Sequence, residues 1–229
     1  MTPPYIVGMD VGQVQDPSAV AVLAVHGGGK YSLVHLDRLR LGMSYPVQVR
    51  TVAALLQVVD QRARREQVAT LLATGGRLSS DPLPAPPRTP LVLDGTGVGR
   101  AVADQFREAG LGPRLTTISI TAGGTVTALG NSLGVPKRDL VATLQVAFQS
   151  KRLQIASSLR LADAFVAEML AFRVKLSAEG RDSYGAEAGM HDDLVLAVGV
   201  ALWHAEWERT TARRLDPKDW KPIHGPATG

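Results

Sequence analysis

The stretch Tyr5-Ile6-Val7-Gly8-Met9-Asp10 decides how the rest of this 229-residue chain is interpreted. It is a short apolar run typical of a buried strand, and it ends on a carboxylate. A second run of the same kind, Pro90-Leu91-Val92-Leu93-Asp94, also ends on aspartate. Strand ends are rigid, so we expect both carboxylates to be held at defined positions on the edge of a sheet.

The elements around these two runs predict a mixed sheet. The first half of the chain predicts strands at 6–11, 18–25 and 31–39, a helix at 46–72, a loop at 74–90, a strand at 91–94, a helix at 100–109 and a strand at 115–120. Asp16-Pro17 and Gly27-Gly28-Gly29 are turn signals between the first three strands, which therefore predict an antiparallel meander. The later alternation of helix and strand favours parallel pairing.

Helices dominate the second half. The pattern predicts a mobile Gly- and Thr-rich segment at 121–134, a helix at 136–150, an extended piece at 152–156, a helix from Ser157 or Ser158 to about 172, a hairpin at 173–188 and a helix at 192–208. We expect one domain over 1–208 and a basic, partly ordered tail over 209–229. This is an α/β arrangement, a meander plus parallel strands flanked by helices, and it fits the ribonuclease H-like fold.

Composition excludes several classes of site. The chain contains no cysteine, which excludes disulfides, thiolate zinc sites and cysteine nucleophiles. It has no apolar run of membrane-spanning length and no signal peptide at its start, so we expect a cytoplasmic protein that is neither secreted nor bound to a membrane. The formal charge of +4 and the sequence pI near 9.6 suit a polyanionic partner.

A third acidic position stands where the last helix begins, in His191-Asp192-Asp193-Leu194. Carboxylates at strand and helix ends, far apart in sequence, are the oxygen ligands that Mg²⁺ or Mn²⁺ needs. Two such ions can activate a water and stabilise the leaving oxygen of a phosphodiester. The pattern therefore predicts a two-metal nuclease without a nucleotide cofactor.

Each acid then has an expected role. Asp10 is the natural bridge between two ions, Asp94 binds one of them, and Asp192 or Asp193 binds the other. His191 is a candidate ligand, proton shuttle or contact to the scissile phosphate. A structural role remains open for each residue alone, because aspartates also begin turns and cap helices.

Basic residues of the second half are candidate DNA contacts. They are Lys137, Arg138, Lys151, Arg152, Arg173, Lys175, Arg181 and, as an aromatic neighbour, Tyr184. A solvated basic face is the alternative for each of them. The glycines at 95, 97 and 99 do not form a phosphate loop for a nucleotide, because the lysine and spacing of such a loop are missing.

In the order and spacing of its motifs, the chain resembles the nuclease domain of the large terminase subunit of tailed bacteriophages. The matching segments are 8–12 with 16–19, 93–99, 135–137 with 140–141, 152–155 and 189–194. The resemblance implies a ribonuclease H-like endonuclease that cuts concatemeric viral DNA during packaging with Mg²⁺ or Mn²⁺. It maps the family's carboxylates onto Asp10, Asp94 and the pair Asp192 and Asp193.

The same resemblance implies partners: double-stranded DNA, a terminase ATPase module, a small terminase subunit and a portal protein. No Walker motif occurs in the chain, so we expect the motor activity to reside elsewhere, with this chain an excised domain or a standalone protein. Two alternatives stay open: a Holliday-junction resolvase-like nuclease of the same fold, and a non-catalytic module that binds DNA or the portal.

Overall fold

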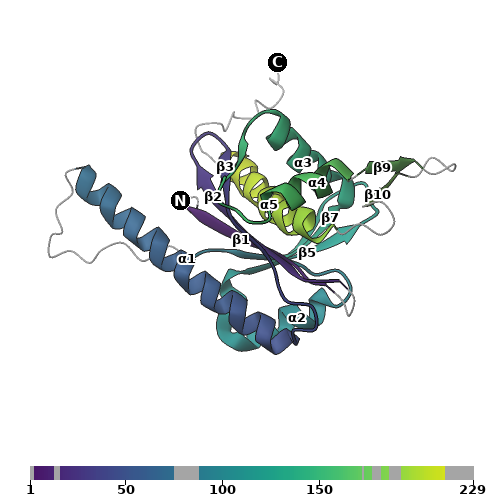
Figure 1. The fold of residues 1–229 in the computed structure, drawn as a ribbon, viewed down its shortest axis with the longest axis horizontal. Coiled ribbons are helices and arrows are strands. Elements are labelled where there is room, and N and C mark those ends of the chain that lie inside the picture. Colours follow the sequence, from purple (N-terminus) through teal and green to yellow (C-terminus); the bar gives the residue numbers. More distant parts are fainter. Residues whose placement is uncertain are drawn as a thin grey trace, which may run out of the picture.

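An eight-stranded mixed sheet forms the middle layer of the molecule (Figure 1). The computed structural model describes residues 3–12, 16–74, 88–171, 173–176, 182–185 and 192–214. The strands of this sheet are β1 (Tyr5–Asp10), β2 (Ala19–His26), β3 (Lys30–Arg38), β4 (Leu91–Asp94), β5 (Leu115–Thr121), β6 (Thr127–Leu129), β7 (Ser132–Pro136) and β8 (Leu153–Ile155). Their spatial order is β6-β7-β5-β4-β1-β2-β3-β8.

Strand direction follows the sequence pattern. β1, β2 and β3 form an antiparallel meander, whereas β1, β4, β5 and β7 run parallel to one another. β8 joins β3 in parallel, and β6 pairs with β7 antiparallel. A meander continued by parallel strands confirms the predicted fold class.

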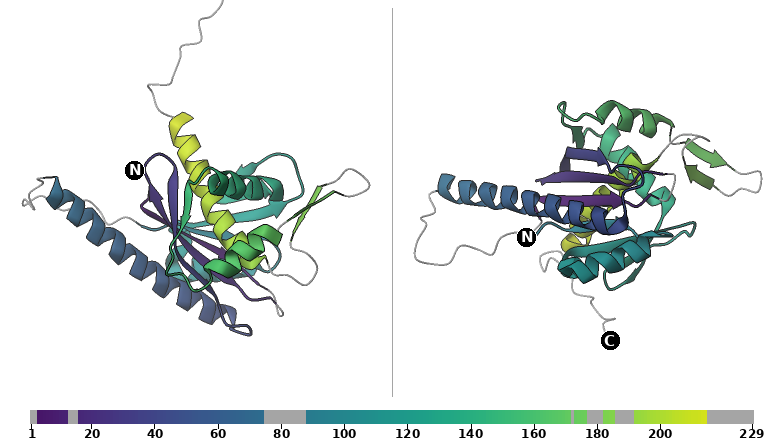
Figure 2. Two further views of the ribbon diagram at one scale, coloured as in Figure 1. Left: turned by 45° about the horizontal axis from the view of Figure 1, so that its top comes forward. Right: turned by 60° about the horizontal axis from the view of Figure 1, so that its bottom comes forward.

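Helices cover both faces of the sheet (Figure 2). They are α1 (Tyr45–Ala73), α2 (Gly99–Phe106), α3 (Lys137–Gln149), α4 (Ala162–Ala171) and α5 (Asp193–Arg214), with short helical turns at Arg107–Leu111 and Gly112–Arg114. α1 and α2 pack on one face, and α3, α4 and α5 on the other. A separate hairpin of β9 (Arg173–Leu176) and β10 (Asp182–Gly185) stands beside the main sheet (Figure 1).

Alternation along the central strands creates two hydrophobic cores. In β1, Ile6 packs toward α5, whereas Val7 and Met9 pack toward α1 and α2. β4 repeats the pattern with Val92 on the α5 side. Because side chains alternate between faces, the last residue of each strand, Asp10 or Asp94, projects on the α5 side of the sheet.

Helix α5 lies unusually close to β1 at Gly8. A Cβ atom on Gly8 would stand 2.1 Å from the carbonyl oxygen of Ala197 and 2.8 Å from the Cβ of Ala201. Only a residue without a side chain allows this approach. The contact brings the first turn of α5 to the end of β1 where Asp10 lies.

We predict that Gly8→Ala lowers the free energy of unfolding by about 3 kcal/mol, because the helix backbone would have to move away from the strand. Gly199→Ala in the same helix is the matched control, since a Cβ there meets no atom within 4 Å. That control should gain up to about 1 kcal/mol from helix propensity. Chemical denaturation of both variants checks the pair, and equal stabilities would contradict the close packing.

The predicted ends of helices and strands differ most from the structure at three places. The segment predicted to be mobile at 121–134 contains β6 and the start of β7, because the pairing of β7 with β5 and of β6 with β7 overrides weak strand propensity. α4 begins at Ala162 and not at Ser157 or Ser158, since residues 157–161 form turns. α5 extends past 208 to Arg214, and Arg209 of that extension pairs with Glu206 one turn earlier in the helix. Among the described residues, no helix is both long and apolar enough to cross a membrane.

Candidate metal-binding active site

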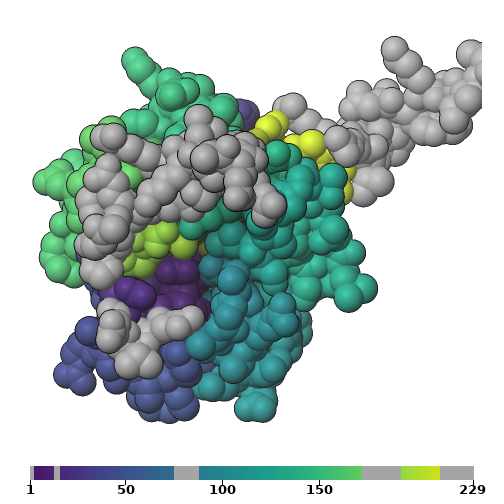
Figure 3. Space-filling view, turned by 90° about the vertical axis from the view of Figure 1, so that its right-hand side faces the viewer, coloured from purple at the N-terminus to yellow at the C-terminus, as the bar shows by residue number. Residues whose placement is uncertain are grey.

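The carboxylates of Asp10 and Asp94 meet at the end of two adjacent parallel strands. Met9 of β1 is paired with Leu93 of β4, so the aspartates that follow them lie level at the same edge of the sheet. The space-filling view looks onto this edge, where purple atoms of β1 meet yellow-green atoms of α5 at the floor of a hollow (Figure 3). The predicted convergence of these two strand ends is therefore present.

The aspartates near this sheet edge repel one another electrostatically. Burial raises the pKa of Asp10 well above its usual range, and the neighbouring charges of Asp94, Asp192 and Asp193 raise it further. Burial also raises the pKa of Asp94, against hydrogen bonds donated by Thr96; the Thr96 amide lies 2.8 Å from Asp94 Oδ1. Carboxylates so close together favour a cation between them.

The two aspartates before α5 have different surroundings. Asp192 is about a third exposed, and its Oδ2 lies 3.5 Å from the Lys137 ammonium nitrogen. Asp193 is buried and accepts two hydrogen bonds from Arg38, at 2.7 Å from Nε and 3.2 Å from Nη2. Asp192 therefore has the more accessible carboxylate, and Asp193 is held by an arginine of β3.

Glu168 of α4 completes the support of this helix start. Its Oε2 accepts hydrogen bonds from the backbone N–H groups of Leu194 at 3.1 Å and Val195 at 3.3 Å, so it caps α5 from a neighbouring helix. Its other oxygen pairs with Arg38. Burial and the charge of Asp193 raise the pKa of Glu168 to about 7, against Arg38 and the two amides.

Sequence reasoning missed Glu168 and Arg38. The available signal was slight: Glu168 is a lone acid in the apolar stretch Phe165-Val166-Ala167-Glu168-Met169-Leu170, and Arg38 ends a half-buried strand. Neither is near an acid of the cluster in sequence. Only the tertiary packing of β3, α4 and α5 brings them together.

Lys137 is the positive charge that acts on both Asp10 and Asp94. It begins α3 directly after β7, and its charge lowers the pKa of both Asp10 and Asp94, opposing the larger effect of burial. Within the described part of the chain, no three acidic or histidine side chains lie close enough together to coordinate a metal ion as they stand. The donors still suit a divalent cation, since they are clustered, oxygen-only and short of countercharge, but a cation must compete with Lys137.

We therefore predict that Mn²⁺ raises the melting temperature of Lys137→Met more than that of the unsubstituted protein. The substitution removes the ammonium that competes for the carboxylates and leaves their repulsion unrelieved until a metal binds. Arg138→Met, which loses the same charge one residue later, is the matched control. Melting curves with EDTA and with Mn²⁺ test this; equal shifts in all three proteins would contradict a competing role for Lys137.

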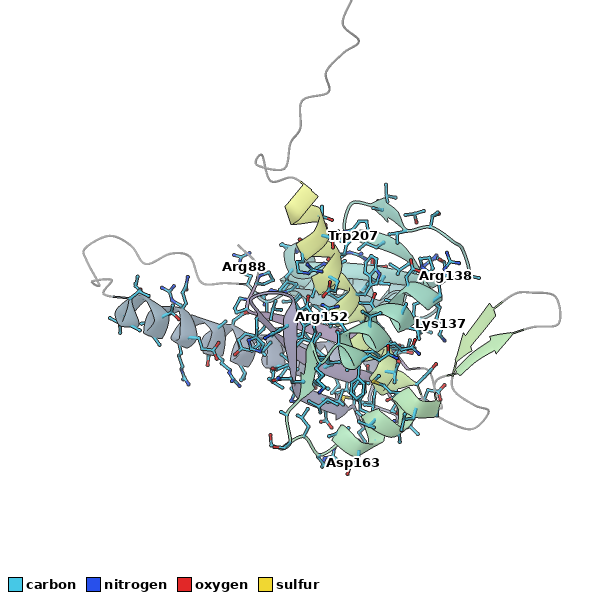
Figure 4. All side chains as sticks on the ribbon, turned by 90° about the horizontal axis from the view of Figure 1, so that it is seen from above. Arg88, Lys137, Arg138, Arg152, Asp163 and Trp207 are labelled. Atoms are coloured by element: carbon cyan, nitrogen blue, oxygen red, sulfur yellow. The ribbon has the colours of Figure 1, made fainter. Side chains whose placement is uncertain are left out.

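Those of the remaining predicted DNA contacts whose side chains the structure describes do not gather at one place. Arg138 lies beside Lys137 (Figure 4) and donates a hydrogen bond of 2.9 Å to the Gly124 carbonyl. Lys151 and Arg152 lie at the opposite edge of the sheet, where Arg152 binds the Gly29 carbonyl and Glu206. Positions 173, 175 and 184 are on β9 and β10, whose side chains are not described. His191 and Arg181 fall outside the described residues.

The comparisons with known proteins concern the fold. No protein-family model and no curated protein matches the chain. The large terminase nuclease from the thermophilic phage G20c superposes with a TM-score of 0.58 at 20% sequence identity, over 87% of this chain and 81% of that chain. The same nuclease with bound magnesium gives a TM-score of 0.57 at 20% identity, over 87% and 80% of the two chains.

A second phage gives the same result. The large terminase nuclease domain of Thermus phage P74-26 superposes with a TM-score of 0.54 at 19% identity, over 87% of this chain and 78% of that chain. At these identities the likeness concerns the fold. The chain has the ribonuclease H-like fold of large terminase nuclease domains, as the sequence predicts.

Proposed function

We propose, from the fold that this chain shares with large terminase nuclease domains, that it is a metal-dependent DNA endonuclease. The observation that carries the proposal is that Asp10 and Asp94 meet at one sheet edge, where the charge of Asp192, at the start of α5, also acts on Asp10. Chain segments so distant in sequence come together here at a cost in electrostatic repulsion. A structural role would be served better by neutral residues.

Asp10, Asp94 and Asp192 would hold Mg²⁺ or Mn²⁺, with two ions as the proposed number. Such ions supply an activated water and neutralise charge on the phosphodiester. Asp193 is proposed to act mainly by placing Asp192, because Arg38 occupies its carboxylate. Lys137 is within reach of the same site, and we assign to it a contact to the scissile phosphate once a metal has displaced it from Asp192.

The proposed substrate is double-stranded viral DNA, cut from a concatemer during genome packaging. A basic sequence pI near 9.6 suits this polyanion. In that setting the partners would be a terminase ATPase module, a small terminase subunit and a portal protein. These partners rest on the likeness of fold and on the sequence resemblance.

The test is cleavage of supercoiled plasmid by the purified chain with Mg²⁺, Mn²⁺ or EDTA. We expect nicked and linear products with either metal and none with EDTA. A four-way DNA junction is included as a parallel substrate. Cleavage of the junction alone would favour a resolvase, and absence of metal-dependent cleavage of any substrate would reject the nuclease.

A further inference from the structure

A polar pocket lies on the opposite face of the sheet from the carboxylates, between α2 and strands β5 and β7. Its volume is about 360 Å³. Its lining combines two arginines, three hydroxyl residues and one carboxylate, and these polar residues are Arg100, Asp104, Arg107, Thr117, Ser119 and Ser132. Thr117 and Ser119 flank Ile118, which packs in the core toward α5, so the two hydroxyl residues project on the α2 face.

Two arginines that line this pocket come from α2 and from the helical turn that follows it. Arg100, Asp104 and Arg107 recur at spacings of four and three residues and therefore share one face of the helical segment. Arg107 is paired with Asp104 at 2.6 Å, but both side chains are largely exposed, and such pairs contribute little to stability. Among the described residues, Arg100 forms no ion pair.

Hydroxyl groups form the floor across from these arginines. The Thr117 and Ser132 hydroxyl oxygens are 2.9 Å apart and hydrogen-bonded to each other. The Ser119 hydroxyl opens to the pocket near Gly95, where an added Cβ would lie 3.7 Å from the Ser119 oxygen. Arginine with serine and threonine hydroxyls is the combination that proteins use to bind phosphate oxygens.

The pocket is close to the carboxylates along the chain. Gly95 directly follows Asp94, so the turn that leads from β4 into α2 connects the two sites around the sheet edge. Teal atoms of this part of the chain border the hollow at that edge (Figure 3). Double-stranded DNA carries phosphates along both strands, so a duplex at the carboxylates brings further phosphates to the same edge.

We propose that this pocket binds a backbone phosphate of the DNA duplex that is cut at the carboxylates, with Arg100 as its main charged contact. The inference rests on the proposed nuclease function and adds a second contact to the substrate on the α2 face. Arg107 joins the phosphate when it leaves Asp104. The pocket thereby fixes the position of the duplex and contributes no reacting group.

Binding of a short blunt DNA duplex, followed by fluorescence anisotropy in EDTA over a range of salt concentrations, tests the proposal. Arg100→Gln should weaken binding about tenfold, as expected for one charged hydrogen bond. It should also lower the slope of log affinity against log salt by about 1. Arg65→Gln, an exposed arginine of α1 with the same loss of charge, should change neither quantity.

Asp104→Asn gives the opposite sign and so cannot be explained by misfolding. It frees Arg107, and we expect binding to strengthen about threefold. Unchanged affinity and salt slope in both pocket variants would overturn the inference. Binding of inorganic phosphate to the pocket, seen by calorimetry, together with unchanged duplex affinity in Arg100→Gln, would also overturn it by assigning the site to a small anion.

The two proposals fail in different ways. The anisotropy measurement is made without metal and without cleavage, so loss of the pocket effect leaves the nuclease proposal intact. The nuclease proposal fails on absence of metal-dependent plasmid cleavage by the unsubstituted chain, which does not depend on Arg100.

Discussion

Asp10→Asn is expected to abolish metal-dependent DNA cleavage while raising the melting temperature of the protein. Asp10 lies where the charges of three other aspartates oppose its ionisation. Loss of a supporting residue around a metal typically costs 10- to 100-fold, so loss of this central carboxylate should lower cleavage more than about 100-fold. The free energy of unfolding in EDTA should rise, because asparagine replaces a buried carboxylate whose charge the neighbouring aspartates oppose.

Asp139→Asn is the matched control for this prediction. Asp139 is a more exposed acid in the first turn of α3, two residues from Lys137, and loses the same charge. Its cleavage rate should stay at that of the unsubstituted protein. Plasmid cleavage and thermal melting are measured on both variants. Cleavage retained by Asp10→Asn, or a melting temperature that falls, would contradict the cluster of repelling carboxylates.

Arg38→Met is expected to be the most destabilising single substitution near the site. Arg38 pairs with Asp193 and with Glu168. Both acidic residues are buried, with 4% of Asp193 and 5% of Glu168 exposed. Removing one partner of a buried charge pair typically costs about 3–5 kcal/mol, because the other charge is left without compensation. Cleavage should fall as well, because the first turn of α5 loses its support.

Two further variants test whether the loss in Arg38→Met comes from the buried charges of Asp193 and Glu168. Arg160→Met removes an arginine that pairs with Asp37 at 2.9 Å on the surface, and it should cost less than about 1 kcal/mol. Combining Arg38→Met with Glu168→Gln should recover part of the loss, because glutamine keeps an acceptor for the α5 amides without the buried charge. Chemical denaturation of these three variants, of Glu168→Gln alone and of the unsubstituted protein gives the comparison. Additive losses would contradict the coupling.

Much of the fold could be predicted because local pattern and tertiary structure agree along β1 and β4. Both strands are short apolar runs that end on aspartate, and parallel neighbours necessarily bring those ends together. β6 and the start of β7 were missed because the glycines of this segment, among them Gly130 and Gly134, weaken any strand pattern. β6 is held only by β7, and β7 in turn pairs with β5.

The candidate site was predicted less completely for a related reason. Asp10, Asp94 and Asp192 stand at the ends of strands or at the start of a helix, and such ends can be recognised from the sequence. The pattern could not choose between Asp192 and Asp193, since that difference comes from Arg38 on β3 and Glu168 on α4. Such contacts are decided by helix packing, which no short segment of sequence encodes. His191 stays a prediction, because it lies outside the described residues.

The place of α5 in the sequence has a consequence for synthesis of the chain. This helix packs on β1, β2 and β4, yet it begins more than 180 residues after the first of them. While the chain grows on the ribosome, the apolar face around Ile6 and Val92 therefore has no permanent cover until α5 emerges. The same helix brings Asp192, so a nascent chain that stops before it has neither a closed core nor a complete acidic cluster. The proposed metal site is therefore complete only after α5 has been synthesised.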